Sequence, residues 1–233
     1  MRSILPKSWI FIVALVLAAP VWAEDSGRII VTGEGRVTAV PDMAIVRMGV
    51  TGQAPVAADA MAQVSETMTA VQAVLAEAGI APRDIQTTSL QLNPRWDNRP
   101  RNEGEAPRIV EYFAETGVTV RVRDLAGLGE VLGAVVSDGA NQFRGLSFDL
   151  AEPDPLMNDA RRAAVADARA KAELYAEAAG VTLGALIELR EQGAQAPRPM
   201  IAEMRMASAD MAVPVAEGEM VLSSSVTLIF ATE

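Results

Sequence analysis

The chain contains no histidine and no cysteine among its 233 residues. Without histidine, Ser-His-Asp and Cys-His catalysis, imidazole metal ligands and the usual general base near neutral pH are excluded. Without cysteine, there are no disulfides and no thiol for a lipid anchor, so the apolar core must hold the fold together. Aromatic residues make up only 4% of the chain, which is poor material for a sugar-binding cleft.

Lysine is also scarce, because Lys171 is the only one beyond the N-terminal segment. It lies in an alanine-rich helical run, which favours a structural, solvated charge over a Ser-Lys nucleophile. Carboxylates are plentiful, but sequence spacing cannot select a hydrolytic pair, because the fold brings such pairs together. We therefore predict a protein that is not an enzyme, and we name no catalytic, cofactor-binding or metal-binding residue.

Long apolar runs are missing except at the N-terminus. Basic residues precede an apolar run of 11 residues from Trp9 to Ala19, and short side chains follow up to Ala23. This pattern predicts a secretory signal peptide at residues 1–23. The alternative, an uncleaved anchor, is disfavoured because the run is shorter than the ~20 residues that span a bilayer. We predict an exported domain at residues 24–233 with no transmembrane segment after signal cleavage.

The exported part is strongly acidic. Removing 23 of the 233 residues leaves 210, and loss of Arg2 and Lys7 changes the formal net charge from −10 to −12. Such a surface repels nucleic acid and anionic lipid headgroups, so we expect no nucleic-acid partner. A chain of this length is sufficient for one large domain with a sizeable core.

Strand-like and helix-like runs alternate along the chain. Alternating side chains or continuous β-branched runs predict strands, and apolar spacings of three and four predict helices. Asp124 is expected to cap the short helix, and the Asp154-Pro155 pair to open the last one. The fold class is α+β, a largely antiparallel sheet with two long helices and one shorter helix packed on it. We expect strands at 28–38, 43–52, 85–92, 109–123, 144–150, 185–190 and 220–230, and helices at 56–78, 125–139 and 154–179.

A helix that stops at glycine, a short turn and a strand occur three times, at Gly79, Gly139 and Gly180. Repeated helix–strand units of this kind are expected after duplication of one unit. They are also expected by chance in an α+β chain of this size, and both alternatives stay open.

Two segments lack a regular pattern. The first, residues 93–108, carries four arginines and Trp96, the only tryptophan beyond the signal peptide. Tryptophan among arginines is typical of an interface anchor, although an aromatic residue that folds back onto its own hairpin is an equal alternative. The second, residues 193–218, is predicted to be a flexible loop. It carries methionines that could bind Cu(I) or be oxidised reversibly, or simply belong to a linker: Met200, Met204, Met206 and Met211.

The stretch Ile30 to Val37 reads IVTGEGRV and suggests a phosphate-binding loop. A dinucleotide fingerprint needs a third glycine and a helix directly after it, and here Thr38 and a second strand follow instead. Gly33 and Gly35 are therefore predicted to mark either a bulge or a close backbone approach inside a strand.

The same stretch, together with Pro41-Asp42, resembles the opening of the SIMPL-domain family, whose bacterial members are called oxidative-stress defence proteins. Trp96 is one departure, since the family more often has tyrosine there. The resemblance covers essentially the whole exported chain. It continues through Ala78-Gly79-Ile80, Asp84 to Thr88, Leu90, Pro94, Tyr112-Phe113-Ala114, Val118 to Asp124, Gly145 to Phe148, Ala160 to Gly180, Leu183-Gly184, Pro214 and Gly218-Glu219.

The resemblance implies a periplasmic or envelope protein of α+β fold, linked to oxidative-stress resistance and, in some members, to ring-like or channel-like oligomers. It supplies no catalytic residue. Together with the missing catalytic groups, it favours a non-enzymatic envelope protein that forms homo-oligomers or binds an envelope protein partner, in the periplasm or associated with the outer membrane. The alternative function is a methionine-rich oxidant sink or Cu(I)-binding protein, and a carboxylate-based enzyme is the weakest hypothesis.

Overall fold

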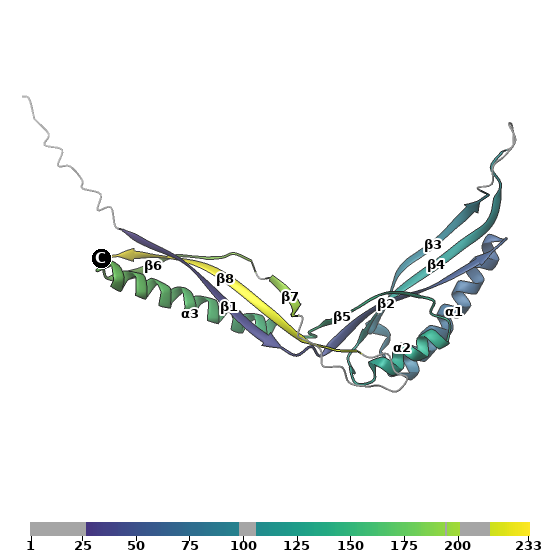
Figure 1. Cartoon of the computed structure of the whole chain (residues 1–233), viewed down its shortest axis with the longest axis horizontal. Helices are drawn as coiled ribbons and strands as arrows, with labels where there is room; N and C mark the ends of the chain where they lie inside the picture. The colour runs from purple at the N-terminus through teal and green to yellow at the C-terminus, as the bar shows by residue number, and fades with distance from the viewer. Residues whose placement is uncertain (1–26, 98–105, 194, 201–214) are drawn as a thin grey trace, which may run out of the picture.

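The computed structural model describes residues 27–97, 106–193, 195–200 and 215–233, and Figure 1 shows their arrangement. They form an α+β fold, as predicted, with two long helices and one shorter helix. The elements in chain order are β1 (Arg28–Ala39), β2 (Met43–Ala54), α1 (Ala57–Glu77), β3 (Ile85–Trp96), β4 (Ile109–Val122), α2 (Leu128–Ser137), β5 (Gln142–Asp149), α3 (Asp154–Ala179), β6 (Leu183–Glu191), β7 (Gln195–Met200) and β8 (Glu219–Thr232).

The strands form two antiparallel sheets, so the prediction of a single sheet is wrong. Sheet I has the order β1-β8-β6, with β7 also paired to β8, and sheet II has the order β3-β4-β2-β5. The chain leaves sheet I after β1, builds all of sheet II, and returns through α3. The two sheets lie end to end in an elongated molecule, with α3 under sheet I and α1 and α2 under sheet II (Figure 1).

Sheet II has one face covered by helices and one open face. The predicted alternation in β4 is confirmed, because Val118, Val120 and Val122 are buried while Arg121 is exposed. Helix α1 lies across β2 and β4, and α2 lies beside α1. A one-sided alternation of this kind follows from burial of a single face of an antiparallel sheet.

Sheet I packs against α3 through very small side chains. Gly33 and Gly35 face the helix, and alanines at every fourth position of α3 face the sheet. A Cβ on Gly35 would lie 1.9 Å from the carbonyl oxygen of Ala160. The β1–β8 register runs through both glycines without a shift. The predicted close approach is therefore confirmed, and the bulge alternative is wrong.

The three predicted helix stops share one geometry. Gly79, Gly139 and Gly180 all have positive φ. In each case the following backbone N–H donates to a carbonyl five residues earlier, as in Ile80 to Leu75 at 3.0 Å. Each of these helix ends leads into a strand at the outside of a sheet: β3, β5 or β6. The repeated geometry is real, while duplication as its origin stays a prediction.

Three local predictions need correction. Asp124 does not cap α2, because its carboxylate accepts from the N–H of Gly127 in the turn before the helix. The segment 93–108 is not irregular from its start, because β3 pairs with β4 up to Trp96. Residues 195–200 of the predicted loop form β7, whose backbone pairs with β8. Residues 201–214 of that loop lie outside the described residues.

Candidate functional site

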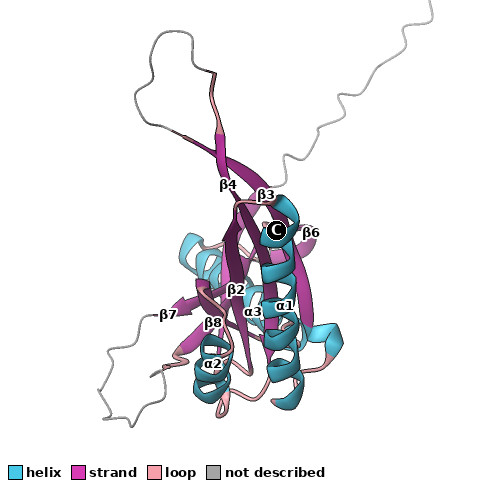
Figure 2. Cartoon of the chain, turned by 90° about the vertical axis from the view of Figure 1, so that its right-hand side faces the viewer, coloured by secondary structure: helices cyan, strands magenta, loops and turns pink. Residues whose placement is uncertain are grey.

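The β3–β4 hairpin projects beyond the rest of the molecule (Figure 2). In β3 the register with β4 shifts between Thr87 and Ser89, so the residues that face the helix side change from odd to even numbers. Leu90, Leu92 and Pro94 consequently lie on one side of the strand. A second register shift, between Arg95 and Trp96, skips a residue of β4 and none of β3, so the alternation along β3 keeps Trp96 on the same side. We call these four residues the arm stripe. Helix α1 covers β2 and β4 but barely reaches β3.

The arm stripe is apolar and exposed. Leu90 keeps 64% of its surface exposed, Trp96 keeps 46%, and Leu92 is similarly open. On the opposite side of the same ribbon, Arg95 forms an ion pair with Glu111 at 2.5 Å. The ribbon therefore has one apolar and one charged side, and nothing among the described residues covers the apolar one.

Trp96 combines features of both sequence-based alternatives. Its backbone pairs with Ile109 across the hairpin, so the residue belongs to its own ribbon. Its side chain still remains half exposed. The residue is thus held in a defined position with an apolar surface available to a second molecule.

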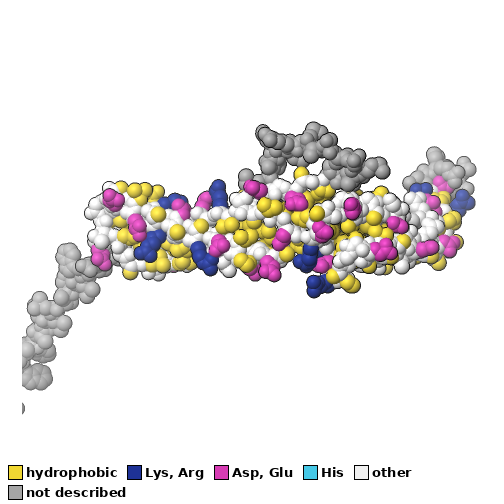
Figure 3. All heavy atoms as spheres, turned by 90° about the horizontal axis from the view of Figure 1, so that it is seen from below, with side chains coloured by type: hydrophobic (Ala, Val, Ile, Leu, Met, Phe, Trp, Pro, Cys, Tyr) yellow, Lys and Arg dark blue, Asp and Glu magenta, His cyan; other side chains and the backbone are white. Residues whose placement is uncertain are grey.

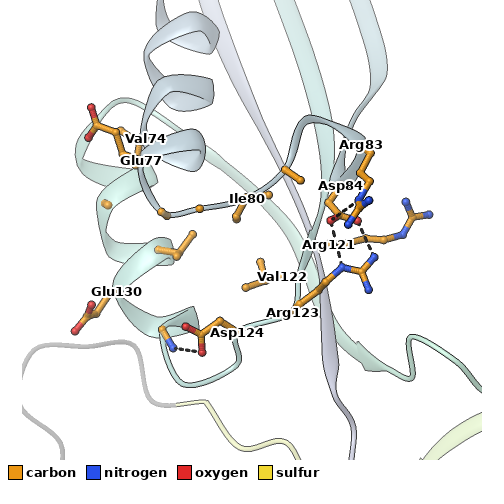
Figure 4. Close-up of a pocket in the computed structure, with 16 residues that line it drawn as sticks. Val74, Glu77, Ile80, Arg83, Asp84, Arg121, Val122, Arg123, Asp124 and Glu130 are labelled. Carbon is orange, nitrogen blue, oxygen red and sulfur yellow. Dashed lines mark hydrogen bonds and ion pairs between the residues drawn. The ribbon is translucent and has the colours of Figure 1, made fainter.

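A cavity of 580 Å³ lies between the end of α1, the end of β4 and the start of α2. Its lining includes apolar side chains such as Val74, Ile80 and Val122. Figure 4 shows Asp84 pointing toward Arg83 and Arg123 on one side, with Glu77 and Glu130 on the other.

Asp84 is the best-defined charged group of this cavity. Only 7% of its side chain is exposed, and Arg123 donates to both carboxylate oxygens, at 3.0 and 3.2 Å. The hydrogen bonds from Arg123 hold the pKa of Asp84 below its usual range and raise the pKa of Arg123. A carboxylate kept ionised in this way is a poor proton donor, and arginine does not exchange protons near neutral pH.

The cavity as a whole has no surplus of positive charge. Its lining carries Arg83, Arg121 and Arg123, but also Asp84 and three further acidic side chains: Glu77, Asp124 and Glu130. Asp84 belongs to the turn before β3 and Arg123 follows β4 directly. We interpret the pair as a brace that fixes the base of the projecting hairpin.

The hydrogen bonds of Lys171 favour the structural alternative for this residue. Its ammonium group donates to Asp167 at 2.7 Å and to the carbonyl of Thr32 at 3.1 Å. Asp167 also accepts the backbone N–H of Glu34 at 2.8 Å. These hydrogen bonds lower the pKa of Asp167, chiefly through Lys171, and the bond to Asp167 raises the pKa of Lys171. Asp167 and Lys171 thus form hydrogen bonds with backbone groups on the outer edge of β1.

The methionines of the alternative function lie in and beyond β7. The backbone of Met200 ends β7, while Met204, Met206 and Met211 lie outside the described residues. Among the residues described, no group of three or more His, Cys, Asp and Glu side chains is placed to hold a metal ion. No described helix is long and apolar enough to cross a membrane.

Charged side chains of both signs are interspersed along the helical face of the molecule (Figure 3).

The sequence pattern identifies Trp96 but not Leu90 and Leu92, its neighbours on the arm stripe. The signal was present, since these three residues follow a spacing of two with Pro94 between them. The sequence does not reveal the register shift in β3, which puts these residues on the helix side of a strand that α1 does not cover.

Comparison with known proteins places these features in one family. The model of the SIMPL family, described as proteins of unknown function (DUF541), matches residues 29–230. The 26 kDa periplasmic immunogenic protein of Brucella melitensis is 41% identical over 226 residues, which cover 91% of this chain and 89% of the relative. The uncharacterized protein YggE of Escherichia coli K12 is 31% identical over 196 residues, or 84% and 76% of the two chains. The match spans sheet I and sheet II, including the β3–β4 hairpin, and the chain belongs to the SIMPL family.

Proposed function

We propose that the protein is an exported envelope protein that works in the periplasm by binding rather than by catalysis. The predicted signal peptide supports export, and the Brucella relative is named a periplasmic protein. The composition supports a non-catalytic role, because the chain has no histidine and no cysteine. Among the residues that the structure describes, Asp84 is the one buried carboxylate, and its hydrogen bonds to Arg123 make it a poor base.

The observation that carries this proposal is the arm stripe. A projecting two-stranded ribbon gains little stability from itself, because it has no core of its own. Apolar side chains in such a position, including a half-exposed tryptophan, are typical of residues that dominate binding energy at interfaces. We propose that the stripe packs against a second copy of the chain, so that the protein functions as a homo-oligomer.

We further propose that the assembled protein contributes to oxidative-stress resistance through the integrity of the envelope. The family resemblance supports the link to stress, and the lack of redox-active cysteine favours an indirect route. In this view the loss of assembly and the loss of protection go together, which the following experiment tests.

The native mass of the mature protein, residues 24–233, is measured by size-exclusion chromatography with light scattering over a range of concentrations. We expect a mass above that of the monomer for the wild type and a smaller mass for Trp96→Ala and Leu92→Ser. Leu174→Ala is the control, since this leucine on α3 is even more exposed than Trp96 and Leu92, and the change should leave the mass unchanged.

Peroxide survival of a strain that lacks the gene is then compared after complementation with each variant. Trp96→Ala should protect less well than Leu174→Ala at equal protein level. A wild type that stays monomeric at all concentrations would refute the assembly, and full protection by a monomeric Trp96→Ala variant would refute its link to stress resistance.

A further inference from the structure

Two outer strands of sheet I, β1 and β6, differ in how their free edges are covered. Near the middle of β1, α3 occupies two of the backbone groups that the strand would otherwise offer to another strand. Asp167 accepts the N–H of Glu34 at 2.8 Å, and Lys171 donates to the carbonyl of Thr32 at 3.1 Å. Covering an edge in this way is a known protection against unwanted strand pairing.

The edge of β6 lacks such protection. In the described part of the chain β8 is the only strand that pairs with β6. Helix α3 lies over β1 and β8 and contacts β6 little. Leu186 and Leu189 therefore keep 49% and 50% of their surface exposed. One ion pair, Arg161 with Glu191 at 2.8 Å, ties the end of β6 to α3 and fixes the strand in place.

The backbone of β6 can accept another strand at Leu189. The N–H of Gln192 donates to the carbonyl of Ser225, and Arg190 lies opposite Thr227. In an antiparallel pair, residues alternate between pointing their N–H and C=O toward the neighbour and away from it. Because residues 190 and 192 point toward β8, Leu189 points its backbone groups outward.

We propose that β6 pairs antiparallel with β6 of a second copy, about a two-fold axis at Leu189. Glu188 and Arg190 form an ion pair within each β6. In this register Glu188 also lies opposite Arg190 of the partner subunit, and the symmetry repeats the pair, so two ion pairs become a four-charge cluster across the axis. An axis at 188 or 190 would instead place two like charges directly opposite each other, which is unfavourable. Charge complementarity thus favours another β6 as the occupant, and among these three registers it favours the axis at Leu189.

The resulting interface is isologous, and it buries the side chain of Leu189 that each copy exposes. The axis is perpendicular to the sheet, so the two sheets join into one continuous sheet and both α3 helices lie on the same face. Leu189 of each copy meets its symmetry mate between the helices. In an isologous contact both copies use the same surface, so none of that surface remains for a third copy, and the contact gives a dimer and not a filament. The inference deepens the proposed assembly, but it involves the sheet that does not contain the arm stripe.

Because the chain has no cysteine, a single introduced cysteine is the only thiol that can form a disulfide in a cross-linking test. Residues directly opposite in an antiparallel pair have Cα atoms about 4.5–5.5 Å apart, within the range of a disulfide. We expect Leu189→Cys to form a reducible, disulfide-linked dimer on mild oxidation. Leu174→Cys, 59% exposed on α3, should remain largely monomeric under the same conditions. Equal dimer yields for the two variants would overturn the proposal.

A charge-reversal experiment tests the register itself. Glu188→Arg and Arg190→Glu each place like charges opposite each other, so each should weaken the β6 contact at least tenfold. A mixture of the two variants should form a heterodimer, because opposite charges face each other again. Reversal without any effect on dimer affinity, or without recovery in the mixture, would overturn the register.

Both experiments are carried out with the wild-type arm and with Trp96→Ala. If cross-linking at residue 189 persists in Trp96→Ala, it supports β6 pairing independently of assembly through the arm stripe. Loss of residue 189 cross-linking with an unchanged native mass overturns β6 pairing while the proposed assembly stands.

Discussion

Replacement of Gly35 by alanine tests the packing of α3 on sheet I most directly. The added Cβ would lie 1.9 Å from the carbonyl oxygen of Ala160 and 2.4 Å from the backbone nitrogen of Ala164. Both atoms belong to the helix backbone, so no side chain can rotate away to make room. The helix or the strand has to move as a whole.

The size of the movement sets the expected cost. Ordinary contacts of a Cβ begin near 3.4 Å, so α3 must lift by roughly 1.5 Å at this point, given that well-packed interiors leave no free space. Overpacking of a core costs about 1–3 kcal/mol. Because the lift also separates Ala160 and Ala164, both fully buried, from the sheet, we expect a loss near the upper end, about 3 kcal/mol in the free energy of unfolding.

Urea denaturation of the mature protein measures this loss. With an m-value of about 2–3 kcal/mol per M, a destabilisation of about 3 kcal/mol lowers the midpoint by about 1–1.5 M. Gly133→Ala is the matched control, since its Cβ would meet no atom within 4 Å and Gly133 lies inside α2. That change should stabilise by about 0.5–1 kcal/mol through helix propensity. If Gly35→Ala cost less than about 0.5 kcal/mol, the close approach of α3 to β1 would be wrong.

Two further predictions concern ion pairs. Arg123 holds the pKa of Asp84 below its usual range, so the pair contributes stability above the unfolded-state pKa of about 3.9 and loses it as the pH falls through the lower folded-state value. Urea midpoints of Asp84→Asn and the wild type should therefore differ near pH 7 and converge below about pH 4; a gap independent of pH would contradict this. Asp167→Ala removes the acceptor of the Glu34 N–H, and hydrogen exchange of this amide should become at least tenfold faster, as opening free energies of exposed edges are small. Arg169→Ala, on the same helix, should leave that rate unchanged, and an unchanged rate in Asp167→Ala would show that the helix does not protect the edge.

The sequence predicted the elements well because their signals are local. The alternation of Val118, Val120 and Val122 is contained in five residues, and a helix stop such as Gly180 needs only its own turn. Strand pairing is different in kind. The contact between β1 and β8 joins residues such as Gly35 and Ser224, which lie at opposite ends of the chain. No local pattern states that β1 belongs with β8 and not with β2, so the division into two sheets was missed.

Of the candidate binding surfaces the sequence indicated only Trp96. Leu90, Leu92 and the edge of β6 were missed for the same reason, which also explains where they lie. Each long helix spans only two strands of its sheet, α1 over β2 and β4, and α3 over β1 and β8. A third strand in each sheet, β3 or β6, then presents apolar side chains on its helix side with nothing above them. Leu189 and Val120 look alike in the sequence, since both sit in strands with apolar and charged neighbours. They differ only in the position of the strand within the sheet. The functional question for this chain is therefore which edges are left open, and α3 closes β1 through Asp167 and Lys171 while it leaves β6 free.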